Sequence, residues 1–485
     1  MIMTGQNTTP LFDAMKSHIE EAVIPFHVPG HKQGKGLTEL TDYLGVRTMQ
    51  MDLNGMPDLD FINHPSGVIM EAQKLFAYAF EADEAFFLVN GTTSGVQAMI
   101  MSVCEPGNEI LIPRNAHKST IGGLILSGAI PVYLEPECNN QLGIAMGVSL
   151  ESVCQGIKEH PHAKGVFLVN PTYYGFTSDL RSIVRTAHAH NMAVLVDEAH
   201  GAHLSFHSSF PLNAMAAGAD MSAVSMHKTA GSLTQSSALL LQGSLVPSSR
   251  VKQVLNLSYT SSASYLLMCS LDLARRQMAV KGKDMLDKVL QWVAWARHNI
   301  NRIPGLYAFG RELAGTPGCF DFDESKLGVN VRRLNYSGYQ IENLLRSNYL
   351  IQVEMSDINN ILAIASIGDE PENFDALVQA LHAIASCSRP MDYREAPPIP
   401  AFGKMIVSPR DAFYAPKKTL SLKAAVGEIA GEMIMAYPPG IPVVCMGERI
   451  TAEIVDYIEL LKREKCELQG TVDRYIDYIQ VLGRR

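Results

Sequence analysis

The sequence has 485 residues, of which 47% are apolar, and its 40 basic and 49 acidic residues give a net charge of −9. This length is too great for one simple core, so we expect two or three domains. The acidic balance, and the lack of any block of five or more basic residues, argue against a nucleic-acid partner.

The lack of a recognisable secretory signal and the pattern of the cysteines predict a cytoplasmic protein. The first seven residues do not combine a basic region with an apolar core, so a secretory signal is not supported, and no apolar run approaches membrane-spanning length. The eight cysteines are scattered without a Cys-x-x-Cys pair, which favours reduced thiols. We therefore expect no membrane partner.

An N-terminal arm, residues 1–63, precedes a long alternation of short apolar strands and helical patterns in residues 64–296. Strands separated by helices are typical of an α/β fold with a doubly wound, mostly parallel sheet, whose site residues lie at the carboxyl ends of strands. The strands are predicted at 85–89, 109–112, 130–134, 165–169, 193–196, 223–225 and 238–242.

Two smaller regions follow this predicted large domain. Residues 297–387 predict a small α+β domain, with strands at 327–334 and 362–367. Residues 388–485 predict a C-terminal domain that begins with a proline-rich linker, 388–400, and ends in a helical pattern at 450–464.

A glycine turn with hydroxyls follows the first predicted strand and precedes an amphipathic helix. Thr92, Thr93 and Ser94 stand at the start of that helix, where unpaired backbone N–H groups and the positive end of the helix dipole favour an anion. This segment is a candidate phosphate site. An ordinary Ser/Thr helix cap, without any ligand, is the alternative.

His117 stands just beyond the second predicted strand. An imidazole in this position could stack on a planar cofactor. It could also be a hydrogen-bonded loop residue, and the residues of this segment alone favour that alternative.

The segment Ser225-Met226-His227-Lys228-Thr229 places a lysine 31 residues beyond Asp197, which ends an apolar strand pattern. A pyridoxal phosphate (PLP) enzyme needs a lysine that forms a Schiff base with the cofactor aldehyde. It also needs a carboxylate that keeps the pyridine nitrogen protonated. Separately, Lys228 could be a solvated loop residue and Asp197 a helix cap or metal ligand, but together they favour a PLP site.

A metal site is the competing interpretation of the histidines that follow Asp197. His200, His203 and His207 lie close together in the sequence. They lack the Glu placement of a His-Glu-x-x-His helix and the thiolates of a structural zinc site. We therefore expect no metal.

Six ordered motifs together resemble the Orn/Lys/Arg decarboxylase family, in its shorter form without the N-terminal receiver-like wing. The resemblance runs from about Pro10 to about Thr451 and implies a PLP enzyme of the aspartate aminotransferase fold, fold type I. The motifs are FHVPGHK at 26–32, NGTTS at 90–94, RNAHKS at 114–119, DEAHGAH at 197–203, SMHKT at 225–229 and YPPGIP at 437–442.

The resemblance implies a role for each matching residue. Lys228 would carry the cofactor, Asp197 would pair with the pyridine nitrogen, and His117 would stack on the ring. The remaining positions would hold the phosphate, lie beside it, or line the pocket under the ring: Thr93, Ser94, Ser225, His227, Ala199 and His200.

The family also implies a homodimer, or a higher homo-oligomer, with shared active sites. The hydroxyl-rich stretch 260–265, which includes Ser261, would reach the phosphate site of the neighbouring subunit. This chain has Ala263 where the family commonly has proline, which weakens the assignment of any single hydroxyl. A serine-rich surface turn is the alternative.

The resemblance implies decarboxylation of a basic amino acid to its amine, with arginine first and lysine or ornithine open, as in polyamine biosynthesis. Protonation at Cα would come from Lys228, His227 or water. Glu448 matches the family's acidic position after the proline-glycine turn and is the first candidate to bind the substrate side chain. Glu354 and Asp357 are alternatives, and each could equally be a solvated surface charge.

Two other function classes remain open. An aminotransferase, or another enzyme on the same cofactor, would also need Lys228 and Asp197, because these residues do not decide which Cα bond breaks. A non-enzymatic cofactor-binding regulator is the third hypothesis. The chain shows no DNA-binding segment, and its lysine is intact.

Overall fold

A computed structural model describes residues 5–388, 400–436 and 440–483. The chain divides into two compact units. The first unit contains Met1–Ser102 and Val196–Leu286, and the second contains Val103–Leu195 and Asp287–Arg485. The domain boundaries after residues 63, 296 and 387 stay predictions, and residues 389–399 of the predicted linker lie outside the described residues.

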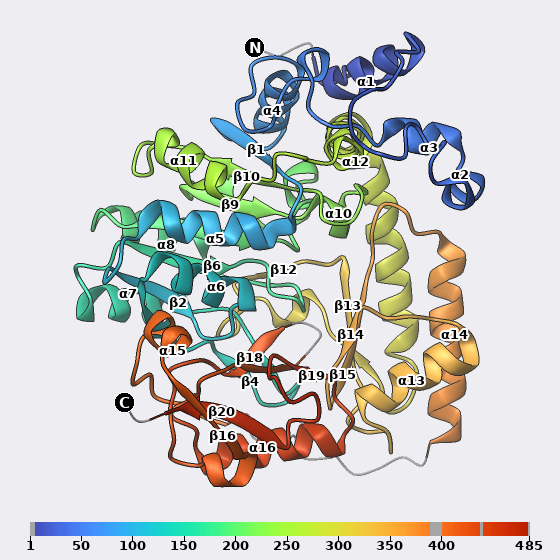
Figure 1. Cartoon of the computed structure of the whole chain (residues 1–485). Coiled ribbons are helices and arrows are strands. Elements are labelled where there is room, and N and C mark those ends of the chain that lie inside the picture. The colour runs from blue at the N-terminus through green and yellow to red at the C-terminus, as the bar shows by residue number, and fades with distance from the viewer. Residues whose placement is uncertain (1–4, 389–399, 437–439, 484–485) are drawn as a thin grey trace. The chain divides into compact units, whose positions relative to one another are not determined.

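The main sheet has seven strands in the order β1-β10-β9-β8-β6-β2-β3 (Figure 1). All seven match predicted strands, because each is a short and mostly apolar run. The sheet is mixed: β2 pairs in parallel with β3 and β6, whereas β10 is antiparallel to both of its neighbours. The strands are β1 (Glu84–Leu88), β2 (Glu109–Pro113), β3 (Ile130–Leu134), β6 (Gly165–Val169), β8 (Ala193–Glu198), β9 (Met221–Val224) and β10 (Ser237–Leu241).

The sheet confirms the predicted α/β class and sets the geometry of the site. All six residues of β8 are buried, so its two terminal carboxyl groups, Asp197 and Glu198, lie out of solvent. The boundary between the two units falls within this strand, at Val196.

The first unit contains both the predicted phosphate segment, residues 92–94, and the predicted lysine segment, residues 225–229. Its helices are α1 (Pro10–Glu20), α2 (Thr38–Leu44), α3 (Val46–Met51), α4 (Val68–Ala79), α5 (Gly91–Val103), α9 (Ala214–Ala217), α10 (Met226–Thr229), α11 (Ser248–Ser258) and α12 (Tyr265–Ile300), with α5 and α12 ending in the second unit, and short 3-10 turns η1 (Pro57–Leu59) and η2 (Leu204–Phe206).

A fully buried ion pair anchors the N-terminal segment to α12. Asp272 and Arg275 are both 0% exposed, and Nη2 of Arg275 lies 2.6 Å from Oδ1 of Asp272. The other oxygen of Asp272 accepts hydrogen bonds from the backbone N–H groups of Leu11 (3.1 Å) and Phe12 (3.3 Å), in the first turn of α1. Arg275 also donates to the carbonyl of Thr8 at 2.6 Å. The pair therefore caps α1 from a helix more than 250 residues away in the sequence.

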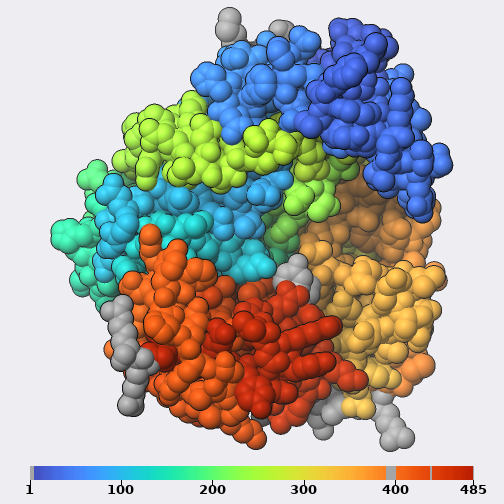
Figure 2. All heavy atoms as spheres, in the orientation of Figure 1, coloured from blue at the N-terminus to red at the C-terminus, as the bar shows by residue number. Residues whose placement is uncertain are grey.

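The predicted N-terminal arm carries a concentration of exposed apolar side chains. Phe26 is 94% exposed, Tyr43 87% and Ile24 76%. The N-terminal residues, dark blue in the space-filling view, lie at the surface of the molecule (Figure 2). So many large apolar side chains exposed within one segment are uncommon on a protein that works as a monomer.

In its described residues, the second unit contains five small sheets besides its share of the main one: β11-β13-β15-β14, β12-β7, β16-β20, β18-β17-β19 and β4-β5. The strands predicted at 327–334 and 362–367 are β13 (Lys326–Asn330) and β15 (Asn360–Ile364), and the helix predicted at 450–464 is α16 (Ala452–Arg463). Its other helices are α6 (Lys118–Ser127), α7 (Leu150–Glu159), α8 (Leu180–His188), α13 (Gly338–Tyr349), α14 (Pro371–Cys387), α15 (Pro409–Tyr414) and the 3-10 turns η3 (Arg311–Leu313) and η4 (Leu422–Ala425). Its other strands are β4 (Cys138–Asn139), β5 (Ile144–Ala145), β7 (Phe176–Thr177), β11 (Tyr307–Ala308), β12 (Asp321–Phe322), β14 (Met355–Ser356), β16 (Lys417–Ser421), β17 (Ile434–Ala436), β18 (Ile441–Val444), β19 (Leu468–Gln469) and β20 (Tyr478–Leu482).

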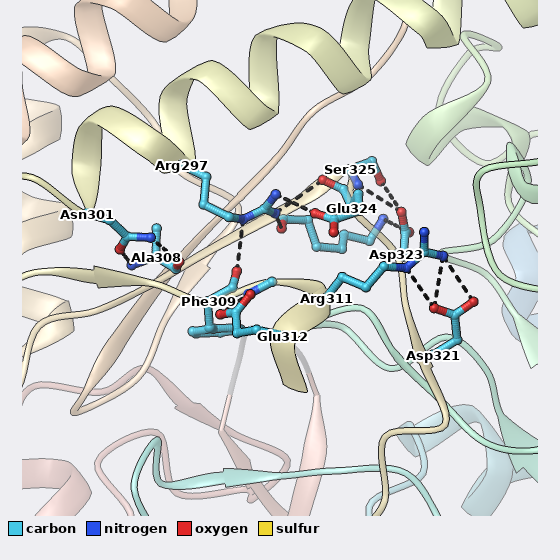
Figure 3. A network of polar contacts seen from close by, with 12 residues as sticks. Arg297, Asn301, Ala308, Phe309, Arg311, Glu312, Asp321, Asp323, Glu324 and Ser325 are labelled. Atoms are coloured by element: carbon cyan, nitrogen blue, oxygen red, sulfur yellow. Dashed lines mark hydrogen bonds and ion pairs between the residues drawn. The ribbon is translucent and has the colours of Figure 1, made fainter. Parts of the chain in front are cut away.

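A polar network joins the end of α12 to the strands beside it (Figure 3). Arg297 donates to the carbonyls of Phe309 (3.0 Å) and Lys326 (2.9 Å) and pairs with Glu324. Nearby, Lys326 and Asp323 form an ion pair at 3.2 Å in which both side chains are 0% exposed. Buried charges of this kind stay in a fold only when they are paired and hydrogen-bonded, as they are here.

Three further findings bear on the expectations from sequence. The eight cysteines, all in described parts of the chain, form no disulfide. No helix of the described ranges is long and apolar enough to cross a membrane. Within the same ranges, no group of three or more His, Cys, Asp or Glu side chains is arranged to hold a metal ion.

Candidate active site

Lys228 lies in α10, the short helix that follows β9. Its Nζ atom is 2.9 Å from Nε2 of His200, a residue of the turn that follows β8. The structure therefore brings together two predicted site residues from the ends of two strands. A half-buried lysine amine held by an imidazole is a suitable nucleophile for an aldehyde.

Asp197 is buried, with 5% of its surface exposed. Burial raises the pKa of its carboxyl group, while the positive charge of Lys228 and a hydrogen bond from the backbone N–H of Ala199 (3.1 Å to Oδ1) partly offset that rise. The hydrogen bond from Ala199 reaches only one of the two carboxylate oxygens.

The hydroxyls at the start of α5 differ from one another in their contacts. Thr92 is buried, is hydrogen-bonded to the Ser225 hydroxyl, and lies 3.1 Å from the Ser237 hydroxyl. Ser94 donates to the carbonyl of Gly91 at 2.8 Å, and Thr93 is exposed. Gly91 has a φ of +70°, which favours glycine at the turn into the helix. The predicted phosphate site thus has its hydroxyls and helix start in one place, and phosphate binding stays a prediction.

His227 precedes the lysine in the sequence, and its side chain is hydrogen-bonded to a backbone carbonyl. Its Nδ1 atom lies 2.9 Å from the carbonyl oxygen of Ser236. Burial lowers the pKa of this imidazole, and the charge of Lys228 adds to that effect. A neutral His227 at physiological pH could accept or relay a proton.

His117 belongs to the second unit, where it caps α6. Its Nδ1 atom accepts a hydrogen bond from the backbone N–H of Ser119 at 3.2 Å and lies 2.8 Å from the Ser119 hydroxyl. Ring stacking by His117 stays a prediction.

The three candidate acids for the substrate side chain have very different surroundings. Glu448 is 0% exposed, and its two oxygens lie 2.8 Å from Nε and Nη2 of Arg114. Asp357 is partly buried, accepts hydrogen bonds from Tyr174 and from the backbone N–H of Asn360, and has its pKa raised by loss of solvent around it. Glu354 is exposed. Glu448 and Arg114 thus form a buried ion pair, and the role of Glu448 as a substrate ligand stays a prediction.

The first three residues of the hydroxyl-rich stretch predicted to reach a neighbouring subunit are exposed. The hydroxyl oxygens of Thr260 and Ser262 are 3.0 Å apart, and Ser261 is at the surface. The stretch ends at α12. Its predicted role in a partner's site is not tested by a single chain.

Two site residues were missed by reasoning from the sequence. Ser237, on β10, contacts Thr92, and Glu198, the last residue of β8, is almost completely buried. Neither carries a local sequence signal, since a serine or a glutamate at a strand end is common. Their position becomes visible only when neighbouring strands are paired.

The residues of the first unit fit the cofactor that the sequence predicts. They supply a primary amine, a buried carboxylate, and a group of hydroxyls at a helix start. These are the three kinds of group that bind the aldehyde, the ring nitrogen and the phosphate of PLP.

Two family models match most of the chain. The Orn/Lys/Arg decarboxylase major domain matches residues 9–328, and the Orn/Lys/Arg decarboxylase C-terminal domain matches residues 399–472. The chain belongs to the Orn/Lys/Arg decarboxylase family. This confirms the resemblance seen in the motifs and makes the chain an amino acid decarboxylase.

Relatives within the family differ in their similarity to this decarboxylase. An arginine decarboxylase of Bacillus subtilis (strain 168) is 42% identical over 99% of this chain and 98% of its own length, and one from Halalkalibacterium halodurans is 42% identical over 99% of both. Lysine decarboxylase LdcA of Pseudomonas aeruginosa is 23% identical over 93% of this chain and 76% of its own.

A solved structure shows the same fold. The constitutive lysine decarboxylase of Escherichia coli has a TM-score of 0.80 and 19% identity, covering 98% of this decarboxylase and 82% of that chain. At that identity the likeness supports the fold alone, which is the predicted fold class.

Proposed function

We propose that this enzyme is a PLP-dependent arginine decarboxylase that releases CO2 and the corresponding amine, agmatine. The observation that carries this choice is the 42% identity to arginine decarboxylases along nearly the full length of both chains, against 23% to a lysine decarboxylase. Lysine and ornithine are the competing substrates.

In this proposal the residues of the first unit divide the work of binding the cofactor. Lys228 holds it covalently, Asp197 holds the proton on its ring nitrogen, and the hydroxyls near Thr92 and Ser94 hold its phosphate. PLP, when bound, supplies an electron sink for the bond that breaks at Cα.

The remaining residues handle the proton and the carboxylate. His200, at 2.9 Å from the lysine amine, orients Lys228. His227, whose pKa is lowered by burial, accepts a proton first and can then pass it toward Cα. Loss of the carboxylate as CO2 then leaves Cα to be protonated by Lys228, His227 or water.

The proposal also includes a homodimer with shared active sites in the cytoplasm. Support comes from the exposed apolar arm around Phe26 and from the exposed hydroxyls near Ser261, both of which suit contact with a second copy.

The decisive experiment offers arginine, lysine and ornithine to the PLP-loaded enzyme side by side and measures CO2 and amine from each. We expect agmatine to form fastest. The Lys228→Ala variant is the control for background release. A higher kcat/KM for lysine or ornithine would contradict the choice of arginine, and keto acid formed without CO2 would favour the aminotransferase alternative.

A further inference from the structure

We propose that Glu198 is a positioning residue for the Asp197 carboxylate, because its own carboxyl group links the end of β8 to β9 and to the start of α9. This inference rests on the proposed function, in which Asp197 pairs with the ring nitrogen of PLP.

The contacts of Glu198 are short and are made from both of its oxygens. Oε1 accepts a hydrogen bond from the backbone N–H of Ala214, and Oε2 accepts one from the Ser222 hydroxyl, each at 2.8 Å. Glu198 is 1% exposed and Ser222 is 0% exposed. The side chain therefore bridges three separate segments of the first unit.

Successive side chains of a strand point to opposite faces of the sheet. Because Asp197 and Glu198 are neighbours on β8, Glu198 faces away from the side on which Asp197 meets the charge of Lys228. Glu198 thus does not act as a cofactor ligand. It can act on the site only by fixing the backbone that carries Asp197.

The segments joined by Glu198 are those that carry the site. Ser222 lies on β9, which leads directly into Ser225 and Lys228. Linking Glu198 to Ser222 therefore fixes the strand end with the carboxylate against the strand that leads to the lysine.

A buried acid is costly, so this position requires an explanation beyond packing. Burial raises the pKa of Glu198 to about 8, so the group is largely protonated and neutral at pH 7. An apolar side chain could fill the same space, but it could make neither of the two hydrogen bonds. The hydrogen bonds are thus what the carboxyl group provides.

The test uses the PLP-loaded enzyme and follows the visible absorbance of the bound cofactor as the pH is changed. Glu198→Asp shortens the side chain by one methylene and should lose both contacts, so the midpoint of this titration should move by about one pH unit, which is a tenfold change in the protonation equilibrium. Glu198→Gln should behave like the natural enzyme, because its amide can accept from Ala214 and donate to Ser222. Ser222→Ala should move the midpoint in the same direction as Glu198→Asp, by less.

Glu432 provides a matched control. It is 5% exposed and accepts hydrogen bonds from the backbone of Gln480 (2.8 Å) and Val472 (3.0 Å) within the second unit. Glu432→Asp should lower stability while leaving the absorbance titration unchanged. That pattern separates positioning of Asp197 from a general loss of stability.

Asp197→Asn is the reference variant. It removes the charge of the carboxylate that Glu198 positions, so it must itself move the midpoint of the absorbance titration. The inference is overturned if folded Glu198→Asp and Ser222→Ala both titrate like the natural enzyme, or if Glu198→Gln shifts as far as Glu198→Asp. If Glu198→Asp does not fold, Ser222→Ala decides by the same criterion. If the midpoint of Asp197→Asn equals that of the natural enzyme, the inference is also overturned. The proposed function is tested separately, by the release of CO2 from arginine.

Discussion

Removing one member of the buried pair Asp272 and Arg275 should release the N-terminal helix α1 from the first unit. Asp272→Asn keeps the size of the side chain and one acceptor for the N–H groups of Leu11 and Phe12. It leaves the guanidinium of Arg275 uncompensated at a position that is 0% exposed. An unpaired buried charge of this kind costs about 3–5 kcal/mol.

This cost should appear first as local opening, because the pair joins α1 to α12 directly. Amide hydrogen exchange in peptides from α1 should become faster by about two to three orders of magnitude, since every 1.4 kcal/mol is tenfold. Peptides from β13 in the second unit serve as the internal control.

The double variant Asp272→Leu with Arg275→Met tests the cause. With both charges removed, the exchange of α1 should be slower than in Asp272→Asn, because no buried charge remains unpaired. An Asp272→Asn variant that changes the exchange of α1 less than tenfold, or a double variant in which α1 exchanges as fast as in Asp272→Asn, would refute the reasoning.

Four further predictions concern the site. Borohydride reduction of the PLP-loaded enzyme should remove its visible absorbance and label Lys228, whereas a label on Lys118 or Lys32 would contradict the assignment. Asp197→Asn should retain the cofactor and lower kcat by about 10²–10³-fold, by analogy with other removed electrostatic groups, and near-normal turnover would mean that another residue holds the ring nitrogen. A Lys228→Ala chain mixed with a chain altered at residues 260–262 should regain activity, because one site of the mixed dimer has every part intact. Confirmed mixed dimers without activity above either parent would exclude the shared site. Finally, because the pKa of Glu198 is about 8 in the folded chain and ordinarily 4.5, only the folded state keeps this proton between those values. The free energy of unfolding should therefore fall as the pH rises through that range, and urea titrations should show a smaller fall in Glu198→Gln.

The strands of the main sheet could be predicted from sequence because their signal is local. Each is a short, mostly apolar run, and observed ends such as Ile130–Leu134 and Gly165–Val169 coincide with the predicted ones. The family could be predicted for a different reason: six short motifs in a fixed order are far more specific than any one of them. The antiparallel direction of β10 had no such signal, since strand direction depends on how the chain returns to the sheet.

Side-chain partners were the part that the sequence did not reveal. Glu448 stood at a position that the family resemblance made a candidate ligand, but its partner Arg114 is 334 residues away. Asp272 similarly caps a helix 261 residues away. Such pairs depend on which buried surfaces meet, and a single sequence contains no record of that choice. The same holds for Glu198 and Ser222.

The pairing of Arg114 with Glu448 has an evolutionary consequence. Arg114 also donates to the carbonyl of Pro442 at 2.8 Å, and Glu448 accepts from the backbone N–H of Cys445 at 2.8 Å, so both side chains are committed to one small region of the second unit. A mutation that neutralises either residue would leave a buried charge behind and would be removed by selection. Substitutions at positions 114 and 448 should therefore arise together in descendants of this gene. In an alignment of the family, these two positions should covary even where the substrate changes.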